Sequence, residues 1–377
     1  MSTEEITEAI DRERDKVLVS VVMPIYNAAE YLVEAIDCVL QQTMKEIELI
    51  CVDDGSTDGS FDLIKKKQEE DKRVRIITEN NAGPSIARNK GLVRARGRYV
   101  IFLDADDFFE PTLLERLYNL AERKRLDIAV ATYDLYNNST GKHSPMIGSE
   151  HGDLLDGGRI ISAREYPDKI FQTVTGYVWN KLFRKSFLTE KNITFHPDLY
   201  VFEDMFFVCA TMALADRIGR DSKVLVHHRI YSEQWRAKLF RKYYARVPIV
   251  YEKLKEFLSS LGMYLPLRQS FLDLSASRCY KIYNLLWEDA KGEFYNMYHD
   301  TYAGAFDWIK ASPYDIESPE VRDFVANVIL YDHAQYLDRV ERGLVIDHER
   351  LPTMVKQKQN RDKFNGFFAR IFKNKKK

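Results

Sequence analysis

Short apolar runs alternate with amphipathic segments through the first 130 residues of the chain. The apolar runs are β-rich, and they predict strands at 17–23, 47–52, 74–78, 99–103 and 128–132. Helical periodicity between them predicts helices at 31–40, 61–70, 84–94 and 111–124. This alternation indicates an α/β fold with a doubly wound, mainly parallel central sheet.

The pattern changes after residue 133. Residues 137–158 are rich in Ser, Thr and Gly and predict a long loop, whereas long helical periodicity beyond residue 238 predicts a helical C-terminal region. We therefore divide the chain into an N-terminal helical extension (1–16), an α/β domain (17–235, with halves 17–133 and 134–235), a helical region (236–350) and a basic amphipathic tail (351–377).

Composition excludes several classes of protein. Lys and Arg number 56 against 57 Asp and Glu, so no overall field favours nucleic acid. The four cysteines lack CxxC spacing, which fits a reducing compartment better than a disulfide framework or a zinc site. No apolar signal core and no apolar run of about 18 residues occurs, so we expect a cytoplasmic protein without a membrane span.

Three carboxylates follow the apolar run at 99–103. Asp104, Asp106 and Asp107 would lie at the carboxyl end of a strand, where open α/β sheets bind ligands. Acids this close repel one another unless a hard cation neutralises them, and such a cation also binds phosphate. The cluster therefore predicts a site for Mg²⁺ or Mn²⁺ and a phosphate compound.

Polar residues also follow the first two predicted strands. Asp53 and Asp54 follow the second strand, and Pro24, Tyr26 and Asn27 end the first. Because the carboxyl ends of parallel strands line one rim, we expect both sets to converge with the acids after the fourth strand. An Asp after the second strand is placed to accept hydrogen bonds from a base or ribose.

Four motifs follow one another in the predicted α/β domain. They are VSVVMPIYN (19–27), VDDGSTD (52–58), GPSIARN (83–89) and DADD (104–107). In these motifs and their order the chain resembles glycosyltransferase family two, strongly over 17–132 and more weakly to about residue 231. The resemblance implies the nucleotide-diphospho-sugar transferase (GT-A) fold. It also implies transfer of a sugar from a nucleotide donor, commonly a UDP-sugar, to an acceptor hydroxyl with inversion.

The same resemblance implies roles for individual residues. The nucleotide would be bound by Pro24, Tyr26, Asn27, Asp53, Asp54, Arg88 and Asp104. Asp106 or Asp107 would ligate the metal directly. His227 and His228 end an apparent strand, and either can complete the metal shell or meet phosphate; we place His228 in the metal set.

An acidic pair, Glu203 and Asp204, opens a predicted helix among apolar residues. Such surroundings raise the proton affinity of a carboxylate toward the range useful for a base. Relatives carry a Glu-Asp pair at this distance from the metal motif, which implies that Asp204 is the catalytic base and Glu203 the reserve. A helix cap is the alternative for Asp204.

Trp179, Asn180 and Lys181 resemble a segment found ahead of the Glu-Asp pair in bacterial relatives that build surface polysaccharides. This similarity implies that Trp179 stacks on a sugar face and that the other two donate to sugar oxygens. A core position for Trp179 is the alternative.

The C-terminal tail carries an apolar stripe among cations. The stripe consists of Phe364, Phe367, Phe368, Ile371 and Phe372, at helical spacing. An aromatic stripe beside lysines favours a helix lying in the headgroup region of an anionic membrane. Docking of the tail on the protein's own core is the alternative.

These features together predict a metal-dependent, inverting glycosyltransferase of the hexosyltransferase class, peripheral on the inner face of the cell membrane. Its acceptor would be a glycan or a lipid-linked glycan in bacterial surface polysaccharide synthesis. Two alternatives remain at this point. A nucleotidyltransferase of the same sheet type normally carries a Gly-rich basic loop where this chain has PIYN (24–27). A catalytically degenerate glycan-binding module is the other.

Overall fold

The computed structural model describes residues 17–145, 151–230, 241–312 and 315–360. The chain forms two compact units, one of residues 1–232 with 257–263 and the other of residues 233–256 with 264–377. Each unit is described by itself.

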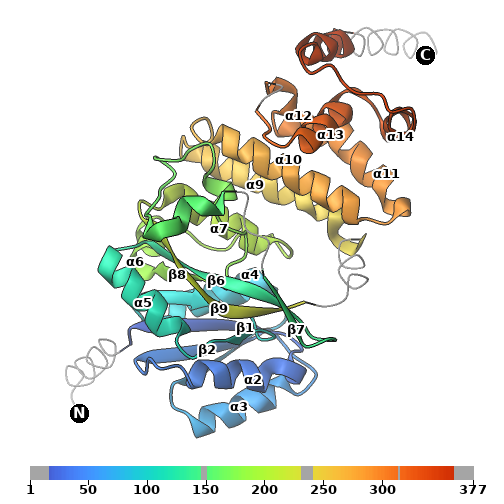
Figure 1. Cartoon of the computed structure of the whole chain (residues 1–377). Helices are drawn as coiled ribbons and strands as arrows, with labels where there is room; N and C mark the ends of the chain where they lie inside the picture. The colour runs from blue at the N-terminus through green and yellow to red at the C-terminus, as the bar shows by residue number, and fades with distance from the viewer. Residues whose placement is uncertain (1–16, 146–150, 231–240, 313–314, 361–377) are drawn as a thin grey trace, which may run out of the picture. The chain divides into compact units, whose positions relative to one another are not determined.

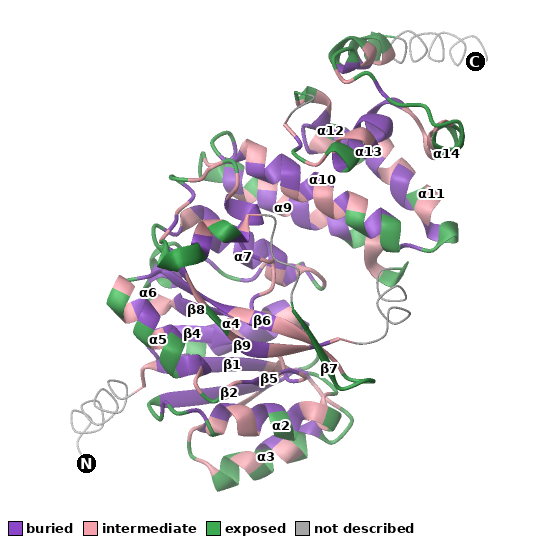
Figure 2. Cartoon of the chain, in the orientation of Figure 1, coloured by how far each residue is buried: buried purple, intermediate pink, exposed green. Residues whose placement is uncertain are grey.

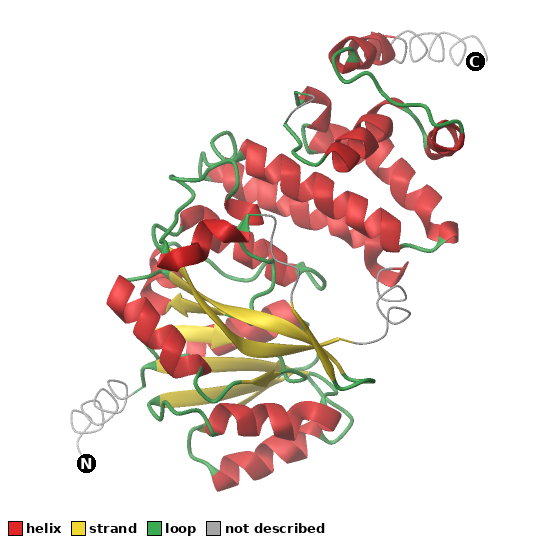
Figure 3. Ribbon diagram, viewed as in Figure 1, coloured by secondary structure: helices red, strands yellow, loops and turns green. Residues whose placement is uncertain are grey.

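The first unit is built on a nine-stranded sheet (Figures 1 and 3). The strands are β1 (Val19–Ile25), β2 (Ile47–Asp53), β3 (Val74–Thr78), β4 (Tyr99–Phe102), β5 (Phe108–Phe109), β6 (Ile128–Asn137), β7 (Lys142–Pro145), β8 (Lys181–Arg184) and β9 (Ile218–Ile230). Their order is β3-β2-β1-β4-β8-β6-β9-β5, with β7 paired to β6.

Strand directions confirm the predicted α/β fold and refine it. β1 to β4 pair in parallel, as do β6 and β9. β8 lies between β4 and β6 and is antiparallel to both, so the strand at 128–137 is not the neighbour of β4. The central sheet is therefore mainly parallel but mixed.

Among the described residues before β9, six α-helices of the first unit flank or follow these strands. They are α2 (Ala29–Leu40), α3 (Ser60–Glu70), α4 (Pro84–Arg94), α5 (Leu113–Lys124), α6 (Lys185–Glu190) and α7 (Glu203–Leu214). Short 3₁₀ helices lie at η1 (Gly152–Gly158) and η2 (Ile170–Gln172). α4 has proline in its first turn, where the fixed φ of proline suits a helix start.

The central strands are buried on both faces (Figure 2). Since successive side chains alternate between faces, Val21 and Met23 of β1 join one core with residues of α2 and α5, while Val22 faces the other way. On that second face, α4 packs closely enough that a Cβ on Gly91 would lie 2.3 Å from Val22 Cγ1. Phe102 contacts Phe207 of α7 there, with ring centroids 5.6 Å apart. This two-sided packing explains the continuous apolar runs of the sequence.

The long loop predicted at 137–158 is wrong over part of its length. Residues 142–145 form β7, which pairs antiparallel with β6, and residues 152–158 form a 3₁₀ helix. β7 is exposed throughout and has the sequence KHSP, so it carries no apolar alternation by which a strand could be recognised.

The second unit consists of helices, which confirms the helical pattern of the C-terminal region. Its elements are η3 (Tyr244–Arg246), α9 (Val247–Ser260, whose last residues belong to the first unit), α10 (Arg268–Leu285), α11 (Glu288–Met297), the π-helix η4 (Tyr298–Tyr302), α12 (Ala303–Ala305), η5 (Trp308–Lys310), α13 (Pro319–Leu330) and α14 (His333–Glu341). Buried aromatic side chains form its core; Trp308, for example, stacks on Tyr298.

Within the described residues, every helix is too short or too polar to span a bilayer. The predicted N-terminal helical extension and the aromatic stripe of the tail lie outside the described residues.

Candidate active site

The carboxyl ends of the parallel strands gather the predicted acids. Asp53 ends β2, and the loop after β4 brings oxygen atoms of Asp104, Asp106 and Asp107 within 4.8 Å of one another. A set of carboxylate oxygens is the donor type that Mg²⁺ and Mn²⁺ prefer. The residues present therefore fit the cation that the sequence predicts.

Asp107 is the anchored member of this cluster. Its side chain is buried, its Oδ1 accepts a hydrogen bond from the backbone N of Arg229 at 2.9 Å, and His228 Nδ1 lies 3.0 Å from both carboxylate oxygens. Burial acts to lower the pKa of His228, but the charge and hydrogen bond of Asp107 outweigh it and raise that pKa. β9 thereby fixes the orientation of the acidic loop, whereas Asp104 and Asp106 are partly exposed.

His228 packs against a stack of two aromatic side chains. The His228 ring stacks on Trp179 with centroids 4.7 Å apart, and Trp179 stacks on Tyr177 at 5.1 Å. Trp179 is 2% exposed. Its predicted role as a sugar platform is therefore wrong in this structure: the indole is a core residue that positions His228.

Asn180 and Lys181 also have internal partners. Asn180 Nδ2 donates to Ala131 O, and the fully buried Lys181 Nζ donates to Asn180 Oδ1 and to the carbonyl oxygens of Thr175 and Tyr177. Burial lowers the pKa of Lys181 to about 7. All three donors of the Lys181 ammonium are used inside the protein, so direct donation to a sugar, as predicted, is not available to it.

Arg88 joins the acidic loop to the start of α7. Its Nη2 lies 2.9 Å from Asp104 Oδ1 and its Nη1 lies 2.6 Å from Glu203 Oε1. Burial disfavours its charge, but Asp104, Glu203 and Asp204 outweigh that effect and raise the pKa of Arg88. The structure thus places Arg88 in a buried ion-pair network, not alone on a helix surface.

Asp204 follows Glu203 in the first turn of α7 and is partly exposed. Burial, followed by the charge of Glu203, raises its pKa to about 7. Its Oδ1 accepts from the backbone N of Met205 at 2.8 Å, so one oxygen also serves the helix start. Phe202, just before the pair, has a positive φ of 57°, a strained conformation of the kind that clusters at functional sites.

The residues predicted to bind the nucleotide divide into two groups. Asn27 and Asp54 hold loops: Asn27 Oδ1 accepts from Thr57 N, and the Asp54 carboxylate accepts from the backbone N of Ala82 and Gly83. Arg88 and Asp104 likewise have partners, in the ion-pair network described above. The other three residues form the second group. Tyr26 is 51% exposed, Pro24 is partly exposed, and the buried Asp53 Oδ1 has no hydrogen-bond partner among the described residues. An orphaned buried carboxylate oxygen indicates a missing donor.

Asn89 supports the site from α4 through hydrogen bonds that the sequence does not predict. Asn89 Nδ2 donates to Phe195 O and Asn89 Oδ1 accepts from Phe195 N, which ties the segment before Glu203 to α4. Asn89 belongs to the GPSIARN motif, which is the sequence feature that could have indicated its importance. Its partner, Phe195, lies 106 residues away and could not be inferred from the motif.

Comparison with known proteins agrees with this geometry. The sequence profile of "Glycosyl transferase family 2" matches residues 20–219, which is more than half of the chain. The chain belongs to glycosyltransferase family 2. This confirms the resemblance found in the sequence.

Relatives of this family-2 chain include two curated bacterial proteins. It is 31% identical over 205 residues to the uncharacterized glycosyltransferase EpsJ of Bacillus subtilis (53% of this chain, 58% of EpsJ). It is 32% identical over 207 residues to the poly(ribitol-phosphate) beta-glucosyltransferase of Bacillus spizizenii (53% of this chain, 30% of that protein). The match thus covers less than two thirds of either relative.

Among solved structures, S. aureus TarS 1–349 in complex with UDP-GlcNAc aligns over 91% of this chain and 92% of TarS 1–349, with a TM-score of 0.60 and 18% identity. At this identity the likeness shows the fold, which confirms the GT-A expectation.

Proposed function

We propose that this family-2 protein transfers a sugar from a nucleotide-sugar donor to an acceptor hydroxyl, with inversion at the anomeric carbon. One observation carries the proposal. Arg88 bridges Asp104 of the acidic loop and Glu203, and so brings a partly exposed carboxylate with a pKa of about 7, Asp204, to the acidic loop. The ion pairs of Arg88 thus connect the site that we propose for the leaving group with the proposed base.

The reaction requires one base. The acceptor oxygen forms a bond to the anomeric carbon, the bond from that carbon to the phosphate oxygen breaks, and the acceptor proton moves to Asp204. A base works best when its pKa lies near the working pH, and the pKa of Asp204 does. Glu203 acts indirectly here, because its carboxylate is paired with Arg88 and its charge raises the pKa of Asp204.

Mg²⁺ or Mn²⁺ would be held by the acidic cluster and would neutralise the charge that develops on the leaving diphosphate. We assign direct ligation to Asp106, with Asp104 beside it, since Asp107 already accepts from His228 and Arg229. The role of His228 is then to orient Asp107. In the nucleoside site, Tyr26 offers an exposed ring, and Asp53 Oδ1 offers an unpaired acceptor for a base or ribose donor.

For the donor we propose a UDP-sugar, and for the acceptor a hydroxyl of a glycan or a related polyol polymer. The complex of TarS with UDP-GlcNAc supports the first choice. The name of the B. spizizenii relative, a poly(ribitol-phosphate) beta-glucosyltransferase, supports the second.

We also propose that the basic aromatic tail attaches the protein to anionic membrane, where a lipid-linked acceptor would be found. Deletion of residues 356–377 should abolish sedimentation with vesicles that contain anionic lipid. Equal sedimentation of the full and shortened chains would contradict this attachment.

A screen of UDP-, GDP- and other nucleotide-sugars tests the function. With Mg²⁺ or Mn²⁺ present, one donor should raise the melting temperature, because a ligand of the folded state stabilises it, and should be hydrolysed slowly to the nucleoside diphosphate. The Asp106→Asn variant should lose both effects. A screen in which no donor binds or turns over would overturn the proposal, and binding without turnover would indicate a glycan-binding module instead.

A further inference from the structure

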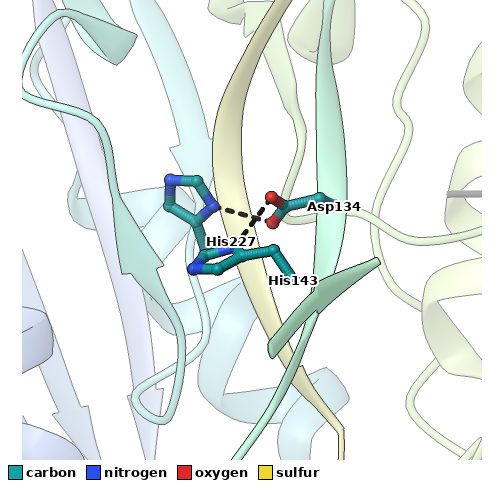
Figure 4. A group of neighbouring side chains, drawn as sticks. All are labelled: Asp134, His143 and His227. Atoms are coloured by element: carbon teal, nitrogen blue, oxygen red, sulfur yellow. Dashed lines mark hydrogen bonds and ion pairs between the residues drawn. The ribbon is translucent and has the colours of Figure 1, made fainter. Parts of the chain in front are cut away.

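A second group of metal-type side chains lies on the other side of β9 from His228. His227 and His228 are consecutive, and successive side chains of a strand point to opposite faces of the sheet. His228 meets Asp107 of the acidic cluster, whereas His227 meets Asp134 and faces His143 (Figure 4). The proposed sugar transfer makes no use of this second group.

Strand register explains why these three residues meet. Asp134 on β6 pairs with His227 on β9, and Tyr136 on β6 pairs with His143 on β7. Residues 134 and 136 share a face because they are two apart, so the side chains of His143 and His227 reach the same face as Asp134. Three adjacent strands therefore deliver two imidazoles and one carboxylate to one place, and the sequence separates them by up to 93 residues.

The distances are those of a compact ligand set. Dashed lines in Figure 4 join the Asp134 carboxylate to each of the two rings: Oδ1 lies 2.7 Å from His227 Nδ1, and Oδ2 lies 2.9 Å from His143 Nδ1. One potential ligand atom from each of the three residues lies within 4.8 Å of the others. In both histidines the ring nitrogen next to Asp134 is Nδ1. A single ion bound by the Asp134 carboxylate would therefore be ligated by Nδ1 of each ring.

A fourth residue gives the cluster the outer contact that metal-binding histidines usually have. Glu110 Oε1 lies 3.2 Å from His227 Nε2, on the far side of the ring from Asp134. When an ion replaces the Nδ1 proton of His227, which is released to solvent, a carboxylate at this position accepts the Nε2–H and keeps the ring oriented toward the ion. This contact is independent of the three inner residues and also points to a metal.

The cluster is shielded on one side and open on the other. Phe108 stacks on the His227 ring at 4.8 Å, and Tyr136 contacts His143 at 5.0 Å. The nearby positive charge of Arg229, which lies over the Phe108 ring, is paired with Glu34 at 2.5 Å. His143 is exposed, which provides a path for an ion to enter.

We propose that Asp134, His143 and His227 bind a transition-metal ion of the Zn²⁺ class, with Glu110 as the orienting residue of His227. Two imidazole nitrogens and one carboxylate oxygen suit Zn²⁺, which is commonly four-coordinate, and a water completes the set. Mg²⁺ prefers oxygen ligands and belongs to the other cluster. In the bound form the ion replaces the hydrogen bonds of Asp134 to both rings and fastens the exposed edge strand β7 to β6 and β9.

Zinc titration of the full chain tests this site. The protein is stripped with EDTA, dialysed and titrated with ZnCl₂ by calorimetry in saturating Mg²⁺, which occupies the acidic cluster. We expect one equivalent of zinc to bind the wild type and the Asp106→Asn variant. Co²⁺ should give the visible absorption of a tetrahedral or five-coordinate ion.

His143→Ala is the informative variant because its side chain is exposed on the edge strand β7. The matched control is Ser144→Ala, the next residue of β7, whose side chain points to the opposite face. His143→Ala should weaken zinc binding by at least about 100-fold, and Glu110→Gln by about 10- to 100-fold, as expected for an outer-sphere partner. Zinc should raise the melting temperature of the wild type and the control, but not of His143→Ala.

Two results would overturn the proposal. One is a wild type that binds no zinc in saturating Mg²⁺. The other is a His143→Ala variant that binds it as tightly as Ser144→Ala. Both results are independent of sugar transfer, so the site and the proposed function fail separately.

Discussion

Arg88 on α4 and Glu203 on α7 form a buried ion pair, with Nη1 and Oε1 2.6 Å apart. The second nitrogen of the same guanidinium lies 2.9 Å from Asp104. The planar guanidinium binds two carboxylates through different nitrogens and so fixes the distance between them. A lysine ammonium, which is a single point charge, would not fix that distance. Arg88 therefore couples the acidic loop, where we place the leaving group, to the turn that carries Asp204.

The Asp204→Asn variant should lose sugar transfer and keep the donor. The amide has nearly the same shape but cannot accept the acceptor proton, so we expect kcat to fall by roughly 10²- to 10⁴-fold, the usual contribution of a positioned base. Calorimetric titration with the nucleoside diphosphate should give an affinity within about twofold of wild type. Normal turnover would rule out Asp204 as the base.

The pH profile should depend on Glu203. Asp204 must be deprotonated to act, so kcat/KM of the wild type should rise as the pH increases through about 7. The charge of Glu203 helps to raise that pKa, so Glu203→Gln should move the rising limb to lower pH. Arg88 lowers the pKa of Asp204, so Arg88→Gln should move the limb upward.

The exposed Asp198 on the loop before α7 provides the control for this profile. Asp198→Asn removes a negative charge without touching the ion-pair network, and its limb should coincide with that of the wild type. Shifts of the same sign in Glu203→Gln and Arg88→Gln would contradict the electrostatic account.

Removal of the divalent cation should abolish donor hydrolysis, and added Mn²⁺ or Mg²⁺ should restore it. Asp106→Asn should reduce turnover by at least about 100-fold at saturating metal, because the ion contributes several kcal/mol of charge stabilisation. Glu69→Gln, an exposed acid of α3, is the matched control and should retain full activity. Turnover that is insensitive to EDTA would remove the metal from the mechanism.

Glu48 should stabilise the opposite end of the sheet in a pH-dependent way. Its buried carboxylate accepts from Ser20, Arg75 and Arg96. Burial acts to raise its pKa, but these partners outweigh it and lower the pKa below the ordinary value of 4.5. The stabilisation is therefore present above pH 4.5 and is lost as the pH falls below it.

We expect Glu48→Gln to reduce the free energy of unfolding by about 2 kcal/mol at pH 7, the value for hydrogen bonds to a charged group. In urea titrations, the difference in the free energy of unfolding between wild type and variant should become smaller at acid pH. Glu46→Gln, an exposed neighbour, should have no such effect. A gap that widens toward low pH would contradict the assignment.

Gly91→Ala should destabilise the first unit although alanine favours helices. The new methyl would lie 2.3 Å from Val22 Cγ1, so α4 would have to shift on β1, at about 1–3 kcal/mol. Val22→Ala should make room, so the double variant should lose less stability than the sum of the single variants. Additive losses in urea titrations would show that the contact is not the cause.

Local sequence patterns were enough to predict most elements of the parallel part of the sheet and the acids at the strand ends. Apolar runs and helical periodicity depend on neighbours a few residues away, so β1 to β4, α2 to α5 and the acids at 104–107 could be predicted locally. The family resemblance added the order of the motifs and the Glu203–Asp204 pair.

The contacts of individual side chains depend on the tertiary structure. Trp179 looked like a sugar platform because a sequence does not show burial, and Arg88 and Glu203 stand 115 residues apart. β8, inserted between β4 and β6, and the polar edge strand β7 carry no local signal of their place. The side chains of His227 and His228 belong to two different clusters because successive side chains of a strand point to opposite faces of the sheet. The pairing register of β6 and β9 then places His227 opposite Asp134, which is distant in the chain.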